Sequence, residues 1–273
     1  MNQTQRAVAS RAIMASKNRV RNMRGMKEGY GMAKYIDETF WWEALGKPDW
    51  YLLLANDFER LEQLAEKRHS VPEHKEIKRE AYALVEKAIR KDHLPVASKG
   101  INFDIARKPI DTIILHHTKN PAGMTLERLN AIQLLRIYGR HFANPTDQQE
   151  QHLKGQAIWS GHFYQNKQVF WGYHWLIRDD GSSEHILEDR YIGWHAGNWG
   201  INMRSVGICI DDDLSEKKPS ETVLKAVAAV IQQHYPKVKI GNILGHGDVN
   251  THTACPGHLF HTQWRQALLD KLV

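Results

Sequence analysis

The sequence has only two cysteines among 273 residues, which is too few for a disulfide framework. Cys209 lies inside an apolar run, where a cysteine is expected to be a small core residue. We therefore expect reduced thiols. Internal repeats and low-complexity tracts are also lacking, and a chain of this length can bury a sizeable core in one large domain or two.

Long hydrophobic runs are missing as well. No stretch approaches the roughly 18 consecutive apolar residues of a membrane-spanning helix, and the N-terminus has no apolar core like that of a secretory signal peptide. The expectation is a chain made in the cytoplasm without a signal peptide or transmembrane segment.

Acidic residues are scarce at the N-terminus. Residues 1–30 carry seven Lys and Arg against Glu28 alone, which accounts for the whole net charge of +6. Such an arm would attract nucleic acid, anionic envelope polymers or acidic lipid, or could be a solvated basic helix. No recognised nucleic-acid motif accompanies it, so no nucleic-acid partner is expected.

The segment after this arm predicts helices. Over residues 32–93 apolar side chains recur at three- and four-residue intervals, with Asp49 as a possible cap and a capping-box pattern at Ser70. The aromatic cluster at residues 40–42 is expected to be core, and residues 92–100 read as a linker. We therefore divide the chain into a basic arm and helical region (1–100) and a second domain (101–273). The role of the first is open.

Two histidine-containing segments suggest a metal site. His246 and Cys255 lie nine residues apart in a turn-rich run, and residues 112–116 read as a buried strand that ends in histidine. Side chains alternate along a strand, so only one of His116 and His117 can face a given site. Two imidazoles and a thiolate could then converge on one cation. Three protein ligands leave tetrahedral zinc one open position for water, as in a catalytic site.

Further motifs lie between these segments. Residues 172–181 read as a strand that ends in an Asp-Gly turn, a second strand begins at Ser183, residues 192–200 form a loop rich in glycine and aromatics, and residues 205–210 are another buried strand. In that order the motifs resemble the zinc-dependent N-acetylmuramoyl-L-alanine amidase family, which includes amidase-type phage lysozymes and peptidoglycan-recognition proteins. The resemblance spans residues 108–272.

The expected fold class is α/β (α+β), with a mixed central β-sheet flanked by helices and preceded by the small helical region. Helices are expected at residues 125–142, 220–235 and 262–272. Metal ligands would emerge from a strand end and a loop on one rim, where a cleft can admit a peptide.

The resemblance also implies site residues. It makes His116, His246 and Cys255 the ligands of Zn²⁺. Tyr173 would lie beside the metal-bound water, and Thr253 would stabilise the oxyanion, with His252 as its competitor because the loop before Cys255 is one residue longer than in compared relatives. The Trp-His-Ala-Gly block would contribute substrate-binding residues near the cleft: Trp194, His195 and Asn198.

The function that the resemblance implies is zinc-dependent hydrolysis of the amide between N-acetylmuramic acid and L-alanine in peptidoglycan or muropeptides. The alternatives are a non-catalytic peptidoglycan-binding or sensing module, and a regulatory binder with a structural zinc. Cys255 favours the enzyme, because non-catalytic relatives often lose the cysteine. The enzyme would act on the cell wall after release or non-classical delivery, with a delivery or immunity partner, and could belong to a phage, a toxin-secreting bacterium or a recycling pathway.

Overall fold

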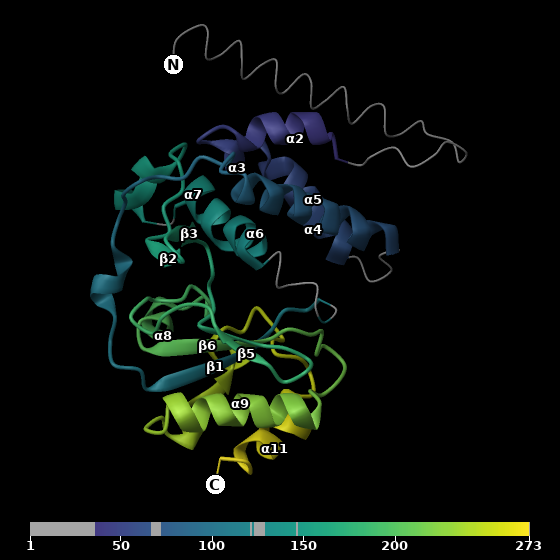
Figure 1. Cartoon of the computed structure of the whole chain (residues 1–273), viewed down its shortest axis with the longest axis vertical. Coiled ribbons are helices and arrows are strands. Elements are labelled where there is room, and N and C mark those ends of the chain that lie inside the picture. Colours follow the sequence, from purple (N-terminus) through teal and green to yellow (C-terminus); the bar gives the residue numbers. More distant parts are fainter. Residues whose placement is uncertain (1–35, 67–71, 121, 123–128, 146, 273) are drawn as a thin grey trace, which may run out of the picture. The chain divides into compact units, whose positions relative to one another are not determined.

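A computed structural model describes residues 36–66, 72–120, 122, 129–145 and 147–272. Within it Ile36–Val273 forms one compact unit (Figure 1). The basic arm at residues 1–30, the capping pattern at Ser70 and the start of the helix predicted from residue 125 lie outside the described residues. In the part of the chain that is described, no helix is long and apolar enough to cross a membrane.

A mixed five-stranded sheet lies at the centre of the second half, as the sequence predicts. Its order is β5-β4-β6-β1-β7. Strand β1 runs parallel to both of its neighbours, β6 and β7, and only β5 is antiparallel to its partner. The strands are β1 (Thr112–His117), β4 (Trp175–Ile177), β5 (Ser183–His185), β6 (Ser205–Ile210) and β7 (Ile243–Gly245).

One face of the sheet packs against the C-terminal helices. Ile113 and Leu115 point toward α9 (Glu221–His234) and α11 (Arg265–Leu269), which cover this face in Figure 1. The helix predicted at 220–235 is confirmed, and Ser220 caps it by accepting a hydrogen bond from the Val223 N–H at 3.2 Å. The closing helix begins as a π-helical turn, η5 (Phe260–Trp264), and continues as α11.

The opposite face packs against a second helical segment. From Leu129 on, the predicted helix at 125–142 is present, although its middle is π-helical. It consists of α6 (Leu129–Gln133), η2 (Leu134–Gly139) and α7 (Arg140–Ala143). Leu129 contacts Leu176 and Cys209 of the sheet, so Cys209 is the buried core residue that the sequence predicts.

The N-terminal region is helical, as predicted, with a different division. It contains α2 (Glu38–Leu45), α3 (Trp50–Leu53), α4 (Ala55–Glu66) and α5 (Pro72–Arg90). The single helix expected after Asp49 is interrupted at Leu54, and the Asp49 side chain makes no capping hydrogen bond. Asp37 caps the preceding helix, α2, since its side chain accepts a hydrogen bond from the Phe40 N–H at 3.0 Å.

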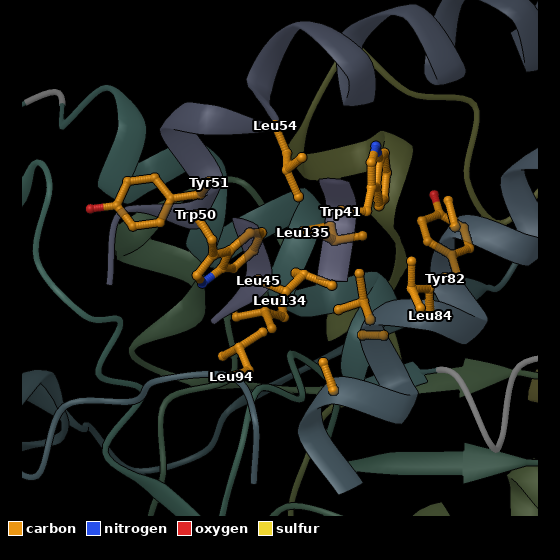
Figure 2. Packing of buried hydrophobic residues seen from close by; sticks show 14 of the residues in the cluster. Trp41, Leu45, Trp50, Tyr51, Leu54, Tyr82, Leu84, Leu94, Leu134 and Leu135 are labelled. Carbon is orange, nitrogen blue, oxygen red and sulfur yellow. The ribbon is translucent and has the colours of Figure 1, made fainter. Parts of the chain in front are cut away.

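These N-terminal helices share a hydrophobic core with the α6–α7 segment. Figure 2 shows Leu45 and Trp50 close to Leu134, and all three are fully buried. A Cβ added to Gly139 would lie 3.5 Å from the Trp50 ring, so the helices approach closely there. Trp41 is buried in this core, which confirms that the aromatic cluster at 40–42 is packing. The division at residue 100 separates the helical region from the segments with the candidate metal ligands. That these two parts differ in function stays a prediction.

The remaining elements connect these layers. Between α7 and β4 the chain forms a hairpin of β2 (His162–Tyr164) and β3 (Lys167–Val169), and Ile158 before it joins the helical core. Val96 of the predicted linker forms a parallel β-bridge with Ile158, and the Ala97 N–H donates to the Ile158 carbonyl at 3.0 Å, so the linker is paired with this segment at that point. The short helices are η1 (Phe103–Ala106), η3 (Gln148–Leu153), α8 (Trp199–Asn202), η4 (Ile240–Asn242) and α10 (His246–Val249).

The shared core predicts one cooperative unfolding transition. Trp50→Ala removes a side chain with 0% exposure and should lower the free energy of unfolding by about 3–5 kcal/mol. Leu53→Ala is the matched control in the same helix, because that side chain is 38% exposed and its loss should cost less than about 1 kcal/mol. Denaturant titrations followed by circular dichroism measure both. Two separate transitions, with the sheet unaffected by Trp50→Ala, would contradict the shared core.

Candidate metal centre

Three candidate ligands converge at one end of the sheet. The register pairs Leu115 of β1 with Gly245 of β7, so the next residues, His116 of β1 and His246 at the start of α10, lie side by side with ring centroids 4.7 Å apart. The loop that carries Cys255 folds back to the start of α10, where the Gly247 N–H donates to the Cys255 carbonyl at 2.7 Å. The ligand atoms of His116, His246 and Cys255 all lie within 4.8 Å of one another.

The hydrogen bonds of the two histidines leave one ring nitrogen of each for a metal. His246 is bonded to the backbone of Ala196, and its Nε2 is buried and has no hydrogen-bond partner among the described residues. His116 directs Nδ1 toward Cys255 Sγ at 3.8 Å. An N/N/S donor set of this kind suits zinc.

A further histidine lies behind the first ligand. The Nε2 of His116 is 3.0 Å from Nδ1 of His195, and the Nε2 of His195 is 3.3 Å from Ser205 Oγ. When His116 offers Nδ1 to a metal, its Nε2–H donates to His195, which in turn has Ser205 as the partner of its other nitrogen. This chain fixes the tautomer and orientation of the ligand, as outer-shell partners of metal-bound histidines do.

Burial keeps the imidazoles neutral. It is the largest cause that lowers the pKa of His116, His195 and His246, and neighbouring histidines lower the pKa of His116 and His195 further. Burial raises the pKa of Cys255 to about 12, against the opposing effects of the His117 N–H and Lys119. A thiolate in this position therefore needs a cation beside it, because metal binding displaces the thiol proton.

The loop that carries His195 is fixed against the sheet. Gly207 of β6 lies under the imidazole, where an added Cβ would be 2.8 Å from the His195 Cγ. Arg107 donates to the backbone carbonyls of Asp189, Asn202 and Ser205 at 2.8–3.1 Å, on either side of the His195 block. Sequence reasoning missed Arg107, because a lone arginine before a strand carries no motif.

His117 lies on the other side of β1 from His116, as alternation requires. Its Nδ1 accepts a hydrogen bond from the Leu214 N–H at 3.0 Å. Its backbone N–H lies 3.4 Å from Cys255 Sγ, within hydrogen-bond reach of sulfur. The side chain of His117 is thus engaged in the structure, and its backbone supports the candidate ligand.

A pocket of about 170 Å³ opens beside the three ligands. Tyr173 and Thr253 both line it, whereas His252 is exposed and outside its lining. The Tyr173 ring lies 4.9 Å from the His116 ring, and its hydroxyl bonds to the Gln133 side chain. Burial raises the Tyr173 pKa well above its usual value, so the phenol is protonated at neutral pH. The Thr253 Oγ accepts the Cys255 N–H at 3.1 Å.

The three residues expected to bind substrate lie elsewhere. His195 is behind His116 and only 5% exposed. Trp194 packs on Trp199 with ring centroids 5.5 Å apart, and Asn198 caps α8 by accepting from the Ile201 N–H at 3.2 Å. None of the three lines this pocket. The pocket instead includes polar residues that sequence reasoning did not select: Thr118, Lys119, Asn120, Gln133 and Arg136.

Comparison with known proteins agrees with the motifs. Residues 106–258, more than half of the chain, match the family model for N-acetylmuramoyl-L-alanine amidase. The chain belongs to this family. No curated protein sequence matches it significantly.

Matches among solved structures come from phage, bacteria and animals. The endolysin of Thermus scotoductus bacteriophage Ph2119 is 22% identical, with coverage of 60% of this chain and 86% of that one and a TM-score of 0.40. The amidase LysC of Clostridium intestinale is 22% identical, with 64% and 93% coverage and a TM-score of 0.42. Drosophila peptidoglycan recognition protein SD is 20% identical, with 62% and 88% coverage and a TM-score of 0.40.

The chain from His116 through His195 to Ser205 predicts an effect on metal affinity. His195→Ala should weaken Zn²⁺ binding by about 10- to 100-fold, since the ligand loses the partner that orients it. His252→Ala is the control, because this exposed histidine is close in sequence to Cys255 and outside the pocket lining. Competition with a chromophoric chelator measures both. Equal affinities in wild type and His195→Ala would show that His195 only fills space.

Proposed function

We propose that the protein is a zinc-dependent hydrolase that cleaves the amide between N-acetylmuramic acid and L-alanine in peptidoglycan or muropeptides. The observation that carries the proposal is the cluster of His116, His246 and Cys255 beside a pocket that Tyr173 and Thr253 line, in a chain of the amidase family. A binding module needs no such juxtaposition of metal ligands with protonated hydroxyls.

Zinc would be held by His116 Nδ1, His246 Nε2 and the Cys255 thiolate. When bound in such a site, zinc makes water a stronger nucleophile at neutral pH and polarises a carbonyl oxygen. The buried histidines meet it as neutral ligands without losing a proton. The His117 backbone N–H, directed at Cys255 Sγ, supports the negative charge of the thiolate.

The two hydroxyl groups of the pocket would supply the rest of the chemistry. Hydrolysis adds the oxygen of water to the carbonyl carbon and a proton to the departing nitrogen of L-alanine. Tyr173, neutral at pH 7, can orient the attacking water and pass a proton. Thr253 accepts its hydrogen bond from the Cys255 N–H, which leaves its own hydrogen to donate to the developing oxyanion.

Delivery to the wall belongs to the same proposal. The basic segment at residues 1–30 would contact anionic envelope polymers or a delivery partner, with an attraction that weakens as the Debye length falls from about 10 Å at 0.1 M salt to about 3 Å at 1 M. An immunity partner would accompany a toxin role and be unnecessary for an endolysin.

The ligand set predicts the metal requirement. The purified protein should carry about one zinc per chain, and His116→Ala, His246→Ala or Cys255→Ala should abolish release of L-alanine-started peptides from purified sacculi. His117→Ala should be much milder, because its side chain bonds to Leu214 and not to the ligand cluster. Metal analysis and chromatography of the released peptides measure both quantities.

Three results would contradict the proposal in different ways. Full activity of metal-free protein would exclude the zinc mechanism. Binding of zinc and sacculi without peptide release would identify a non-catalytic module. Zinc without affinity for murein would leave the metal a structural role.

Tyr173 should contribute to catalysis without holding the metal. Tyr173→Phe keeps the ring packed on His116 and removes only the hydroxyl, so turnover should fall by about 10²-fold while zinc content is unchanged. Tyr164→Phe is the control, because this tyrosine is 44% exposed and outside the pocket. An unchanged rate in Tyr173→Phe would reduce this residue to packing.

A further inference from the structure

A cation in the pocket wall is held by the N-terminal helices. Arg136 belongs to η2, and its Nε lies 3.6 Å from the Glu62 Oε1 of α4. The Tyr82 hydroxyl of α5 donates to the same oxygen at 2.8 Å and is itself hydrogen-bonded to Arg136. Lys78 donates to the second oxygen of Glu62 at 2.9 Å. Glu62 and Tyr82 therefore fix the guanidinium from a region that contributes no metal ligand.

Glu62 is negatively charged at neutral pH and can hold Arg136 there. Burial raises its pKa, but the combined effect of Arg136 and Lys78 is larger. The net result is a pKa lowered to about 2. The carboxylate thus stays ionised down to strongly acidic pH. The interaction that holds Arg136 does not titrate under the conditions in which an amidase would work.

The pocket that Arg136 lines is electropositive. The Arg136 side chain is 36% exposed, and Lys119 lines the same pocket. No aspartate or glutamate is among the described residues of the lining. Arg136 also interacts electrostatically with Tyr173, which places its charge close to the candidate reaction site.

We propose that Arg136 is a specificity-determining residue that binds a free carboxylate of the peptide attached to the scissile amide, and that Glu62 and Tyr82 of the N-terminal helices position it. The inference rests on the proposed function. A guanidinium has five N–H donors in a planar fork and can bind a carboxylate with two hydrogen bonds, while Glu62 and Tyr82 occupy only part of that set. The helical region is then a part of the substrate site and not only a delivery module.

The test compares two ligands that differ in one group. N-acetylmuramoyl-L-alanyl-D-glutamate has a free carboxylate where N-acetylmuramoyl-L-alanyl-D-isoglutamine has an amide. Dissociation constants are measured by calorimetry on the full, zinc-loaded chain in a Tyr173→Phe background, which slows hydrolysis. We expect the acid to bind about 10- to 100-fold more tightly than the amide, and Arg136→Gln to remove this preference with little effect on the amide.

Four variants complete the design. Arg136→Lys should restore part of the preference, because it keeps the charge and loses the fork. Glu62→Gln and Tyr82→Phe should weaken binding of the acid, by less than Arg136→Gln, and leave the amide unaffected. Arg140→Gln is the matched control, since it removes the same charge from an exposed position one turn further along.

The outcomes separate this inference from the proposed function. Equal affinity of both ligands for protein with Arg136 intact, or an equal loss for both ligands in Arg136→Gln, overturns the carboxylate site even where amidase activity is found. A preference that depends on Arg136 in a protein that never hydrolyses muropeptides supports the site and overturns the proposed activity. A preference abolished equally by Arg140→Gln would show only a diffuse attraction and also overturn the proposal.

Discussion

The site depends on the placement of β1 between two parallel neighbours. Because β1 is paired on both edges and buried on both faces, its end is fixed to within a register step, and His116 is set beside the first residue after β7. A slip of one residue would turn the His116 side chain to the other face of the sheet, away from His246 and Cys255. The return of the loop to Cys255, closed by the bond from the Gly247 N–H, adds the sulfur. The other parts of the structure described below surround and support these three ligands.

Two layers of support surround the ligands. On the sheet side, the chain from His116 through His195 to Ser205 determines which nitrogen of the ligand carries the proton. On the other side, the N-terminal helices share a core with the segment that carries Gln133 and Arg136, two residues of the pocket wall. The helical region and the candidate centre are thus connected by packing and by the Glu62–Arg136 ion pair, although every ligand motif lies in the second half of the chain.

The sequence predicted well those features that local patterns determine. The apolar runs at 112–116 and 205–210 are strands because they lack any polar face, and β6 has the predicted bounds. Helix α9 was predictable from its period and its Ser220 cap. The candidate ligands followed from spacing together with the family resemblance, and the structure brings all three together.

The burial of individual site residues and the contacts between separate elements could not be predicted from local sequence patterns. The Trp-His-Ala-Gly block indicated a site residue, but whether His195 lines the cleft or lies behind a ligand depends on the room that Gly207 leaves on another strand. The break at Leu54, a fully buried residue, lies inside an unbroken helical pattern of the sequence. Arg136 lies more than 50 residues after Glu62 and Tyr82, and no motif connects the three.

The most direct test of the account is X-ray absorption spectroscopy at the zinc edge of the zinc-loaded protein. We predict two nitrogen ligands at about 2.0–2.1 Å and one sulfur at about 2.3 Å, with the sulfur contribution lost in Cys255→Ser. A spectrum without sulfur in the wild-type protein, or one that Cys255→Ser leaves unchanged, would contradict the assignment of His116, His246 and Cys255 as the metal centre.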